Sequence, residues 1–161
     1  MTTEIVIVDF NNPLHCRDLP EMLDSYACDP MGGGTPLAEK IKAQLMTELS
    51  KLPYYVGFLV YQNDKPVAFA NCFMGFSTFA CKALLNIHDF AVLPEHRGQG
   101  LSQMLMKAIA AKAKELGCCK LTLEVLSGNA SAINAYKKFG FTLYQLDEKA
   151  GTAQFMECSL S

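Results

Sequence analysis

The chain has 161 residues, half of them hydrophobic, and a formal net charge of −2 at pH 7. This composition excludes an intrinsically disordered protein, and the length predicts a single domain over residues 1–161. A slightly acidic chain has no broad basic surface, so we expect no nucleic-acid partner and no membrane partner. Because no apolar run approaches roughly 20 residues and the N-terminus lacks a signal-peptide pattern, we expect a cytoplasmic protein.

The seven cysteines favour the same compartment. Their number is odd, none of them form a CxxC pair, and most lie in apolar surroundings, as small core residues do in a reducing compartment. The adjacent Cys118 and Cys119 could form a redox or metal pair. A metal site needs further ligands at fixed spacing, so we favour a turn before a buried strand and expect no metal.

Strand and helix patterns alternate in the first half of the chain. A strand is predicted over residues 4–8 and a helix over 13–27, which Asn12 caps and Pro20 could split. Residues 29–36 hold three glycines between two prolines, which predicts a bent or mobile loop. A second helix from Leu37, a hairpin and a further strand follow, at residues 37–52, 54–76 and 83–93.

The second half has a clearer pattern. A long helix is predicted from Leu101 to Gly117, then a strand over residues 120–126. A short helix follows, capped by Asn129 and ended by Gly140. Residues 141–146 and 152–160 predict a closing hairpin. The element order indicates a mixed α+β protein with one mixed, mostly antiparallel sheet of about seven strands and about four flanking helices.

The segment "EHRGQGLSQML", Glu95 to Leu105, joins a strand to the long helix. The first turn of a helix has unpaired backbone N–H groups and a partial positive charge. Gly98 and Gly100 let an oxyanion approach the backbone, and Arg97 adds a planar set of donors. Such a bend can bind phosphate or pyrophosphate. Gln103 rules out the GxGxxG pattern and no Walker Lys-Ser/Thr pair is present, so an ordinary turn with a surface arginine is the alternative.

Two motifs resemble those of the GNAT N-acetyltransferase superfamily. Residues 97–102 resemble its pyrophosphate loop, Q/R-x-x-G-x-G/A, with Ser102 where the family usually has glycine or alanine. Downstream, the pattern V-x3-N-x2-A-x3-Y-x-K-x-G-F is matched at Val125, Asn129, Ala132, Tyr136, Lys138, Gly140 and Phe141. Together the motifs cover about Ile87 to Phe141. The resemblance implies the acyl-CoA N-acyltransferase (GNAT) fold and acetyl-CoA as co-substrate.

The resemblance also assigns roles to individual residues. Backbone amides of Arg97, Gly98, Gln99, Gly100, Leu101 and Ser102 would hold the pyrophosphate of acetyl-CoA. The strand ending at Ala91 and Val92 would separate from the one near Glu124 and Val125, with the pantetheine arm between them, and an N–H near Val92 would polarise the thioester carbonyl. Asn129 would contact the cofactor arm. Tyr136 would direct its hydroxyl at the sulfur, or be a packing aromatic of an amphipathic helix.

The chemistry requires a proton acceptor, because an alkylamine with a pKa of about 10.4 is protonated at neutral pH and cannot attack a thioester. The strand "NIHDFAV" resembles that of diamine acetyltransferases, which have an acidic residue where this chain has His88. Histidine can accept a proton near neutral pH. Asn86 shares the strand face of His88, and Asp89 is expected on the opposite face. Glu124 is the competing base, and a strand histidine without any proton role is the alternative reading of His88.

Acceptor selection is expected from the first helices, their loop and the facing strands. Contributing residues are expected to be Asp24, Asp29, Met31, Gly32 to Gly34, Phe73, Phe76 and Phe79, although a purely structural loop explains the two aspartates equally well. We therefore predict an acetyl-CoA-dependent N-acetyltransferase acting on a primary amine of a small molecule or peptide. A non-catalytic acyl-CoA-binding or sensing module and an O- or longer-chain acyltransferase are the alternatives. The closing hairpin offers edges for a homodimer.

Overall fold

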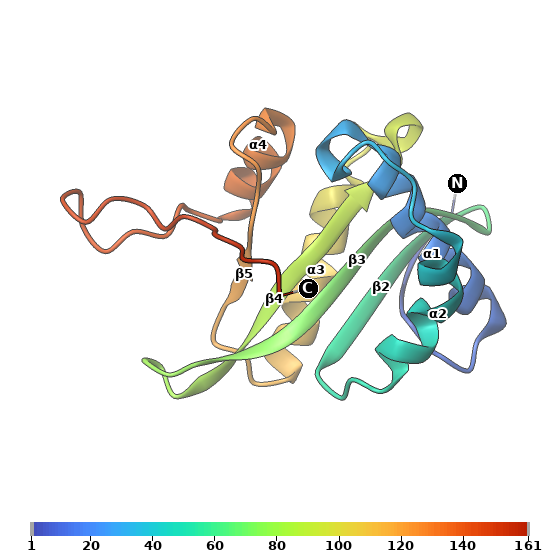
Figure 1. Cartoon of the computed structure of the whole chain (residues 1–161), viewed down its shortest axis with the longest axis horizontal. Coiled ribbons are helices and arrows are strands. Elements are labelled where there is room, and N and C mark those ends of the chain that lie inside the picture. The colour runs from blue at the N-terminus through green and yellow to red at the C-terminus, as the bar shows by residue number, and fades with distance from the viewer. Residues whose placement is uncertain (1, 161) are drawn as a thin grey trace. The chain divides into compact units, whose positions relative to one another are not determined.

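The structure is a computed structural model that describes residues 2–160. The chain divides between Leu123 and Glu124 into two compact units, whose helices and strands are drawn in Figure 1. Each unit is described by itself below, and the single domain expected from the chain length stays a prediction. No helix within residues 2–160 combines the length and the apolarity needed to cross a bilayer.

The first unit contains one five-stranded sheet in the order β1-β2-β3-β4-β5. Its strands are β1 (Thr3–Ile7), β2 (Tyr55–Gln62), β3 (Lys65–Ser77), β4 (Lys82–Val92) and β5 (Leu121–Leu123). Strands β1 to β4 pair antiparallel, and β5 runs parallel to β4. The mixed, mostly antiparallel sheet is confirmed, because β2, β3 and β4 follow one another through tight turns while β5 returns after a helix.

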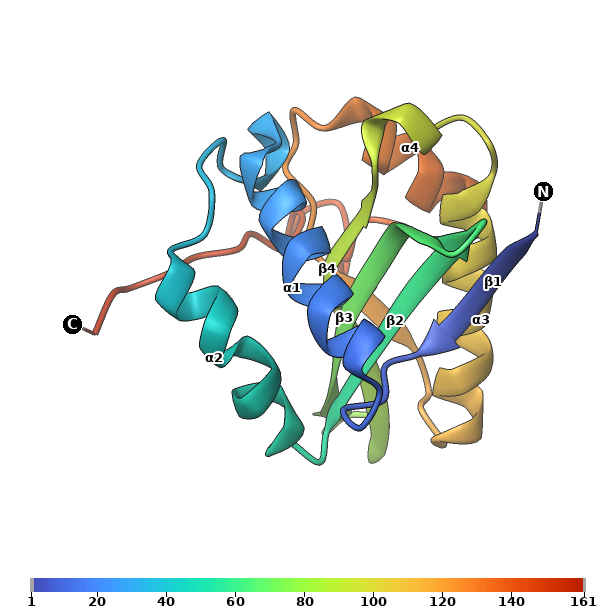
Figure 2. The same ribbon diagram turned by 90° about the vertical axis from the view of Figure 1, so that its right-hand side faces the viewer.

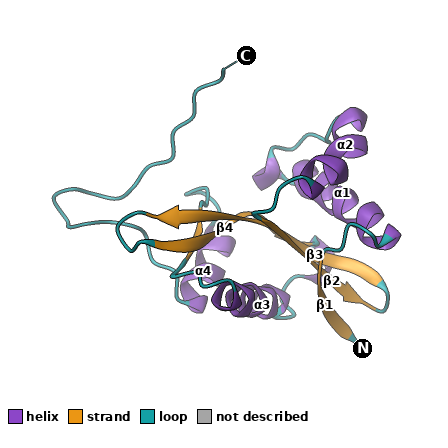
Figure 3. Ribbon diagram, turned by 90° about the horizontal axis from the view of Figure 1, so that it is seen from below, coloured by secondary structure: helices purple, strands orange, loops and turns teal. Residues whose placement is uncertain are grey.

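Helices cover both faces of this sheet. Helices α1 (Pro13–Cys28) and α2 (Glu39–Ser50) lie on one face and α3 (Leu101–Glu115) on the other (Figures 2 and 3). The α1/α2 side buries Leu19, Met22, Leu49, Leu59 and Phe69 in one cluster. On α3, the apolar side chains recur at helical spacing, and Leu105, Met106 and Ile109 are fully buried. Two packed faces therefore hold β2, β3 and β4 rigidly.

Helix α1 continues through Pro20, so the proline does not split it. Its start is as predicted: the Asn12 side chain accepts the Leu14 N–H at 2.9 Å, and Pro13 occupies the first turn. A proline inside a helix removes one backbone hydrogen bond. The neighbouring Leu19 and Met22 are buried in the core, and this packing holds the helix together across the missing bond.

The second unit contains helix α4 (Ala130–Phe139). The Asn129 side chain accepts the Ala132 N–H at 3.2 Å, and Gly140, at φ 123°, follows the last turn, so both predicted ends are confirmed. The closing hairpin is wrong, because residues 141–160 form only an isolated bridge between Gln145 and Thr152. Two strands without a third are marginal by themselves. The described chain therefore has five strands rather than about seven.

The strand predicted over residues 120–126 is also shorter. Strand β5 contains only Leu121 to Leu123, each paired with one residue of β4 between Leu85 and Ile87. Glu124 and Val125 lie beyond its end. The alternating apolar pattern of the segment continues past the last paired residue, and alternation alone does not tell where a neighbouring strand stops pairing.

Gly57 in β2 makes room for a tyrosine ring. A Cβ atom at this position would lie 2.1 Å from the hydroxyl oxygen of Tyr55 and 2.8 Å from a methyl carbon of Val8. Tyr55 is buried, so its ring has little space into which to move. The glycine is therefore required by close packing on the α1/α2 side of the sheet.

We predict that Gly57→Ala lowers the free energy of unfolding by about 1–3 kcal/mol, the usual cost of overpacking. Chemical denaturation measures the change. Gly128→Ala is the matched control, because a methyl group there would meet nothing within 4 Å. Equal stability of the two variants would contradict the packing role of Gly57.

Candidate active site

The bend between β4 and α3 has the geometry of an anion site. After the short helix η2 (Pro94–His96), Gly98 and Gly100 adopt left-handed φ values of 76° and 78°. Added Cβ atoms would meet nothing within 4 Å, so open space faces both glycines. No side chain caps α3 at Gly100, which leaves the first-turn amides for a ligand. The fit of a diphosphate to this bend is therefore good.

The end of β4 directs the backbone of Val92 away from β3. Hydrogen-bonded and non-hydrogen-bonded pairs alternate along antiparallel strands. The Leu93 N–H donates to the Val67 carbonyl at 2.9 Å, so the next pair, Val92 with Ala68, is of the non-hydrogen-bonded kind. The N–H and C=O of Val92 consequently point outward from β3. Since β5 pairs only as far as Ile87, β5 does not cover this edge.

Arg97 makes two bonds with its guanidinium group. Its Nε donates to the Val92 carbonyl at 3.0 Å, and one Nη donates to the Asp29 carboxylate at 2.9 Å. About half of the Arg97 side chain is exposed. Arg97, which is expected to add charge at the bend, therefore also contacts the loop after α1. Sequence reasoning missed this contact, because 68 residues separate the two partners.

Gln62, at the end of β2, supports the bend, and sequence reasoning missed this residue too. Its buried amide lies at the end of β2 and donates to the Thr3 hydroxyl at 3.3 Å and to the Gln99 side chain at 3.5 Å. The His96 Nδ1 lies 3.0 Å from the Gln62 carbonyl oxygen, which only accepts, so this ring nitrogen donates. One buried amide thus ties β1 to both sides of Arg97.

A β-bulge brings His88 and Asp89 to the same face of the sheet. Asn71 pairs with Asp89 and the next residue of β3 pairs with Ile87, so His88 is the extra residue. Its ring meets the Phe73 ring edge-on at a centroid distance of 5.5 Å. The expectation that Asp89 points away from His88 is wrong, because a bulge interrupts the alternation of side chains along a strand.

Asp89 ends a chain of buried hydrogen bonds. The Tyr55 hydroxyl donates to the Asn71 side-chain oxygen at 2.8 Å, and the Asn71 amide donates to the Asp89 carboxylate at 3.0 Å. Burial raises the pKa of the Tyr55 phenol, and the charges of Cys72 and Asp89 raise it further. Burial, with a smaller effect of Asp89, raises the pKa of the Cys72 thiol to about 12. Tyr55 therefore stays a hydrogen-bond donor, and the network fixes the carboxylate.

The two aspartates expected on the acceptor side both have hydrogen-bond and ion-pair partners within the protein. Asp24 accepts the Leu37 N–H at 2.7 Å and pairs with Lys42 at 3.6 Å. Asp29 accepts the Met31 N–H at 2.9 Å, and this bond, with Arg97, lowers the pKa of its carboxyl group. These contacts give each aspartate a structural role in its loop, and their part in acceptor selection stays a prediction. Asp89 is the carboxylate that accompanies the aromatic rings of Tyr55 and Phe73 on this face.

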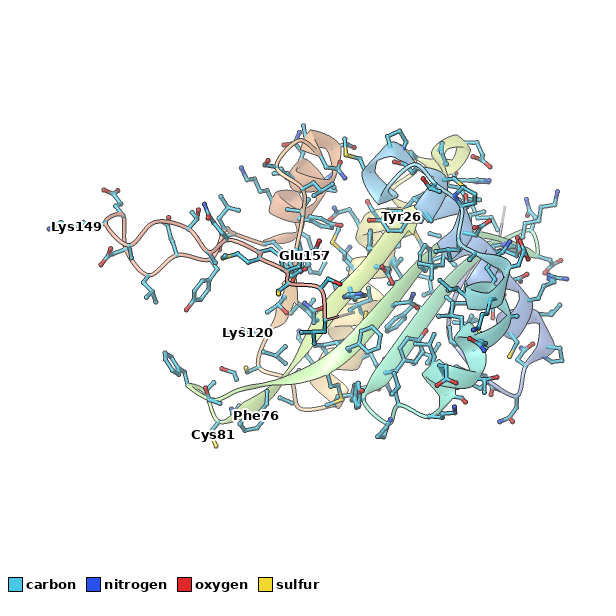
Figure 4. All side chains as sticks on the ribbon, in the orientation of Figure 1. Tyr26, Phe76, Cys81, Lys120, Lys149 and Glu157 are labelled. Atoms are coloured by element: carbon cyan, nitrogen blue, oxygen red, sulfur yellow. The ribbon has the colours of Figure 1, made fainter. Side chains whose placement is uncertain are left out.

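The remaining aromatic candidates lie farther along the sheet. Phe76 and Phe79 are 60% and 98% exposed, at the tip of the β3–β4 hairpin. Figure 4 shows Phe76 and Cys81 at this tip, while Tyr26 lies near the end of α1 at the opposite end of the sheet. Phe73 therefore borders His88, and the two other phenylalanines do not belong to the same cluster.

Three predicted site residues belong to the second unit. Glu124 is its first residue, Asn129 uses its side-chain oxygen to cap α4, and Tyr136 packs its ring at 5.9 Å from that of Phe141. Their approach to the bend stays a prediction. Within residues 2–160, the structure groups no three His, Cys, Asp or Glu side chains in a manner that could hold a metal ion.

The model of the Acetyltransferase (GNAT) family matches residues 19–141. The chain belongs to this family. The match includes the bend, the bulged strand and helix α4, so the resemblance expected from the two motifs is confirmed.

Curated relatives of this GNAT chain are themselves acetyltransferases. A streptothricin acetyltransferase from Streptomyces lavendulae is 41% identical over 90 residues, which are 55% of this chain and 48% of the relative. A thialysine N-epsilon-acetyltransferase from Bos taurus is 29% identical over 110 residues, or 67% of this chain and 58% of the relative. The chain thus spans about half the length of the curated relatives it matches.

Solved structures confirm the fold. An aminoglycoside acetyltransferase from an uncultured soil metagenomic sample, in complex with sisomicin, superposes with a TM-score of 0.80 at 14% identity, covering 99% of this chain and 97% of the other. An integron cassette protein from the mobile metagenome of V. cholerae gives a TM-score of 0.76 at 23% identity, covering 98% and 94%. At these identities the likeness shows the GNAT fold alone.

We predict that Gln62→Leu loosens the bend of this GNAT chain. Of the three hydrogen bonds lost, the two to Gln99 and His96, each of about 0.5–1.5 kcal/mol, hold the bend, so amide hydrogen exchange of residues 97–102 should speed up at least about fivefold. Exchange followed by mass spectrometry checks this. Gln154→Leu, at an exposed position of the second unit, is the control. Unchanged exchange in the Gln62 variant would contradict the positioning role.

Proposed function

We propose that this chain is an acetyl-CoA-dependent N-acetyltransferase that acetylates a primary amine of a small molecule or peptide. The observation that carries the proposal is the β4–α3 junction. There an outward-facing Val92 backbone is followed within a few residues by an uncapped helix start lined by two left-handed glycines. Membership of the GNAT family and the acetyltransferase names of the curated relatives support the same reaction.

Acetyl-CoA supplies the acetyl thioester in this proposal. The bend holds its diphosphate through the amides of residues 97–102 and the charge of Arg97. Leu101 is buried in the core, so it contributes only backbone, whereas Ser102 can add a hydroxyl donor. The Val92 N–H polarises the thioester carbonyl from the edge of β4. Ala91 packs into the α1/α2 cluster and keeps that strand end in place.

Two residues of α4 and its cap complete the proposed cofactor contacts. The Asn129 amide nitrogen can donate to the pantetheine arm while its oxygen caps the helix. The Tyr136 hydroxyl donates a hydrogen bond to the sulfur as the thiolate leaves. Because a tyrosine phenol is a weaker acid than a thiol, Tyr136 assists this departure without full proton transfer being required.

The acceptor amine has to lose a proton before it attacks. Neutralising an alkylamine at pH 7 costs roughly 4–5 kcal/mol, from about 3.4 pKa units. We propose that His88 accepts the proton and that Asp89, fixed by Asn71, attracts the cationic form of the amine. The rings of Tyr55 and Phe73 add an apolar, cation-attracting wall. Glu124 remains the competing base.

Assembly and location form part of the same proposal. Large apolar side chains of the second unit stay exposed within it, including Leu143, Tyr144, Phe155 and Met156. A second copy of the chain could cover them, which supports a homodimer. Only Cys72 among the seven cysteines is buried, so the expectation that most of them serve as small core residues is wrong. Their odd number and the lack of a CxxC pair in the sequence still favour a reducing compartment such as the cytoplasm.

An amine panel with acetyl-CoA tests the proposed function. We expect release of free CoA thiol with at least one small primary amine among diamines, lysine analogues, aminoglycosides and peptide N-termini. Gly100→Val should abolish this release, because valine is strained at φ 78° and its side chain fills the open space of the bend. Thermal melting by circular dichroism establishes that the variant is folded.

Other outcomes of the panel separate the alternatives. Binding of acetyl-CoA without turnover of any amine would favour the sensing module. Turnover confined to hydroxyl acceptors or to longer acyl-CoA substrates would favour the O- or longer-chain acyltransferase. Full activity of Gly100→Val would remove the bend from the site.

The proton acceptor is tested by the pH dependence of the rate. With His88 as the base, the wild-type rate should rise as the pH is raised, because only a neutral imidazole ring accepts a proton. His88→Ala should lose this rise and lower turnover by about 10²- to 10⁴-fold. Glu124→Gln and Asp89→Asn are the matched variants. If Glu124→Gln loses the rise instead, His88 is not the base.

A further inference from the structure

Arg97 connects the bend to the loop that follows α1, and this contact is more than a local ion pair. The segment from Asp29 to Gly34, which we name the glycine loop, lies beside the bend after β4 (Figure 1). Asp29 organises this loop: its carboxylate accepts the Met31 N–H, and its backbone carbonyl accepts the N–H groups of Gly32 and Gly34 at 2.8 and 3.0 Å. Arg97 therefore contacts the residue on which the loop turns.

The residues on either side of Gly33 and Gly34 are fixed to α1. Gly32 packs so closely on the last turn of α1 that a Cβ atom would overlap the Tyr26 carbonyl oxygen, and the Thr35 N–H donates to the Ala27 carbonyl at 3.1 Å. Between these points Gly33 and Gly34, at φ 118° and 73°, have open space around them. Gly33 and Gly34 thus have room to move that Gly32 lacks.

The guanidinium group of Arg97 is held at its Nε atom, while about half of the side chain is exposed to solvent. Its Nε is bound to the Val92 carbonyl, which fixes one edge of the plane at the end of β4. A guanidinium is a rigid plane with five N–H donors, so its Nη donors change partner only when the whole plane swings about the Nε bond. In the ion pair with Asp29, the Arg97 side chain is about half-exposed, and ion pairs of this exposure contribute little to stability. A diphosphate has more negative charge than one carboxylate and attracts the same donors more strongly.

Resting on the function proposed above, we infer that Asp29 competes with the diphosphate of acetyl-CoA for Arg97. Before the cofactor binds, the ion pair holds the glycine loop against the bend. Cofactor binding takes the Nη donors of Arg97, breaks the pair and releases the loop. Asp29 consequently sets both the cofactor affinity and the mobility of a loop expected on the acceptor side.

The affinity of acetyl-CoA tests this exchange. Asp29→Asn removes the charge but keeps a side-chain oxygen that can accept the Met31 N–H. It should bind acetyl-CoA about two- to fivefold more tightly than wild type in titration calorimetry, the range of an ion pair of this exposure. Glu21→Gln, an equal change of charge at an exposed position of α1, is the control and should shift the affinity much less.

A double-mutant cycle distinguishes competition for Arg97 from the general effect of removing one negative charge. In an Arg97→Gln background, Asp29→Asn should no longer tighten binding, because the competing pair is already absent. Tightening of equal size in both backgrounds would overturn the inference, as would equal affinities of Asp29→Asn and Glu21→Gln. If the wild-type protein does not bind acetyl-CoA at all, the proposed function fails and the exchange fails with it.

Hydrogen exchange gives a second measurement. Acetyl-CoA should speed amide exchange of Gly32 and Gly34 about two- to fivefold in the wild-type protein, because the loop loses the anchor of an ion pair of this kind. In Asp29→Asn these amides should exchange faster without cofactor and show no further change with it. Slower or unchanged exchange of the wild-type loop on cofactor binding would overturn the release.

Discussion

The hydrogen bond from Leu93 to Val67 determines what the end of β4 can do. It sets the phase of the β3–β4 ladder, so the backbone of Val92 faces outward rather than toward β3. Arg97 then takes the carbonyl of Val92, and the bend that follows opens helix α3 with its glycines exposed. The cores on both faces of the sheet hold β3 and β4 in place. The end of β4, Arg97 and the first turn of α3 therefore form one rigid junction.

Much of the fold was readable from local patterns. The apolar spacing of α3, the cap at Asn12 and the cap at Asn129 with Gly140 are each decided within a few residues, and all are confirmed. The closing hairpin could not be decided in this way. Its two segments have the alternation of strands, but a strand exists only where a neighbour pairs with it, and alternation does not reveal that neighbour.

The candidate site, too, was predictable only where its residues lie close together in the sequence. The glycines and arginine of the bend are contiguous, so the motif revealed them, whereas Gln62 and Asn71 act on the site from other strands. In the sequence, each is a polar residue within an apolar strand pattern, and no neighbouring residue indicates its hydrogen-bond partner. The Arg97–Asp29 contact joins segments 68 residues apart, and the bulge at His88 depends on pairing with β3. Long-range geometry of this kind has no local signature.

The extra residue in β4 has a consequence for how the acceptor face could change during evolution. Deleting one residue at the bulge would restore regular alternation, so His88 and Asp89 could no longer occupy one face together. The residues before the deletion would keep their partners in β3, and the strand end that feeds the bend would keep its phase with Val67. A single-codon loss could thus change the side chains that β4 places on this face while the bend before α3 stayed intact.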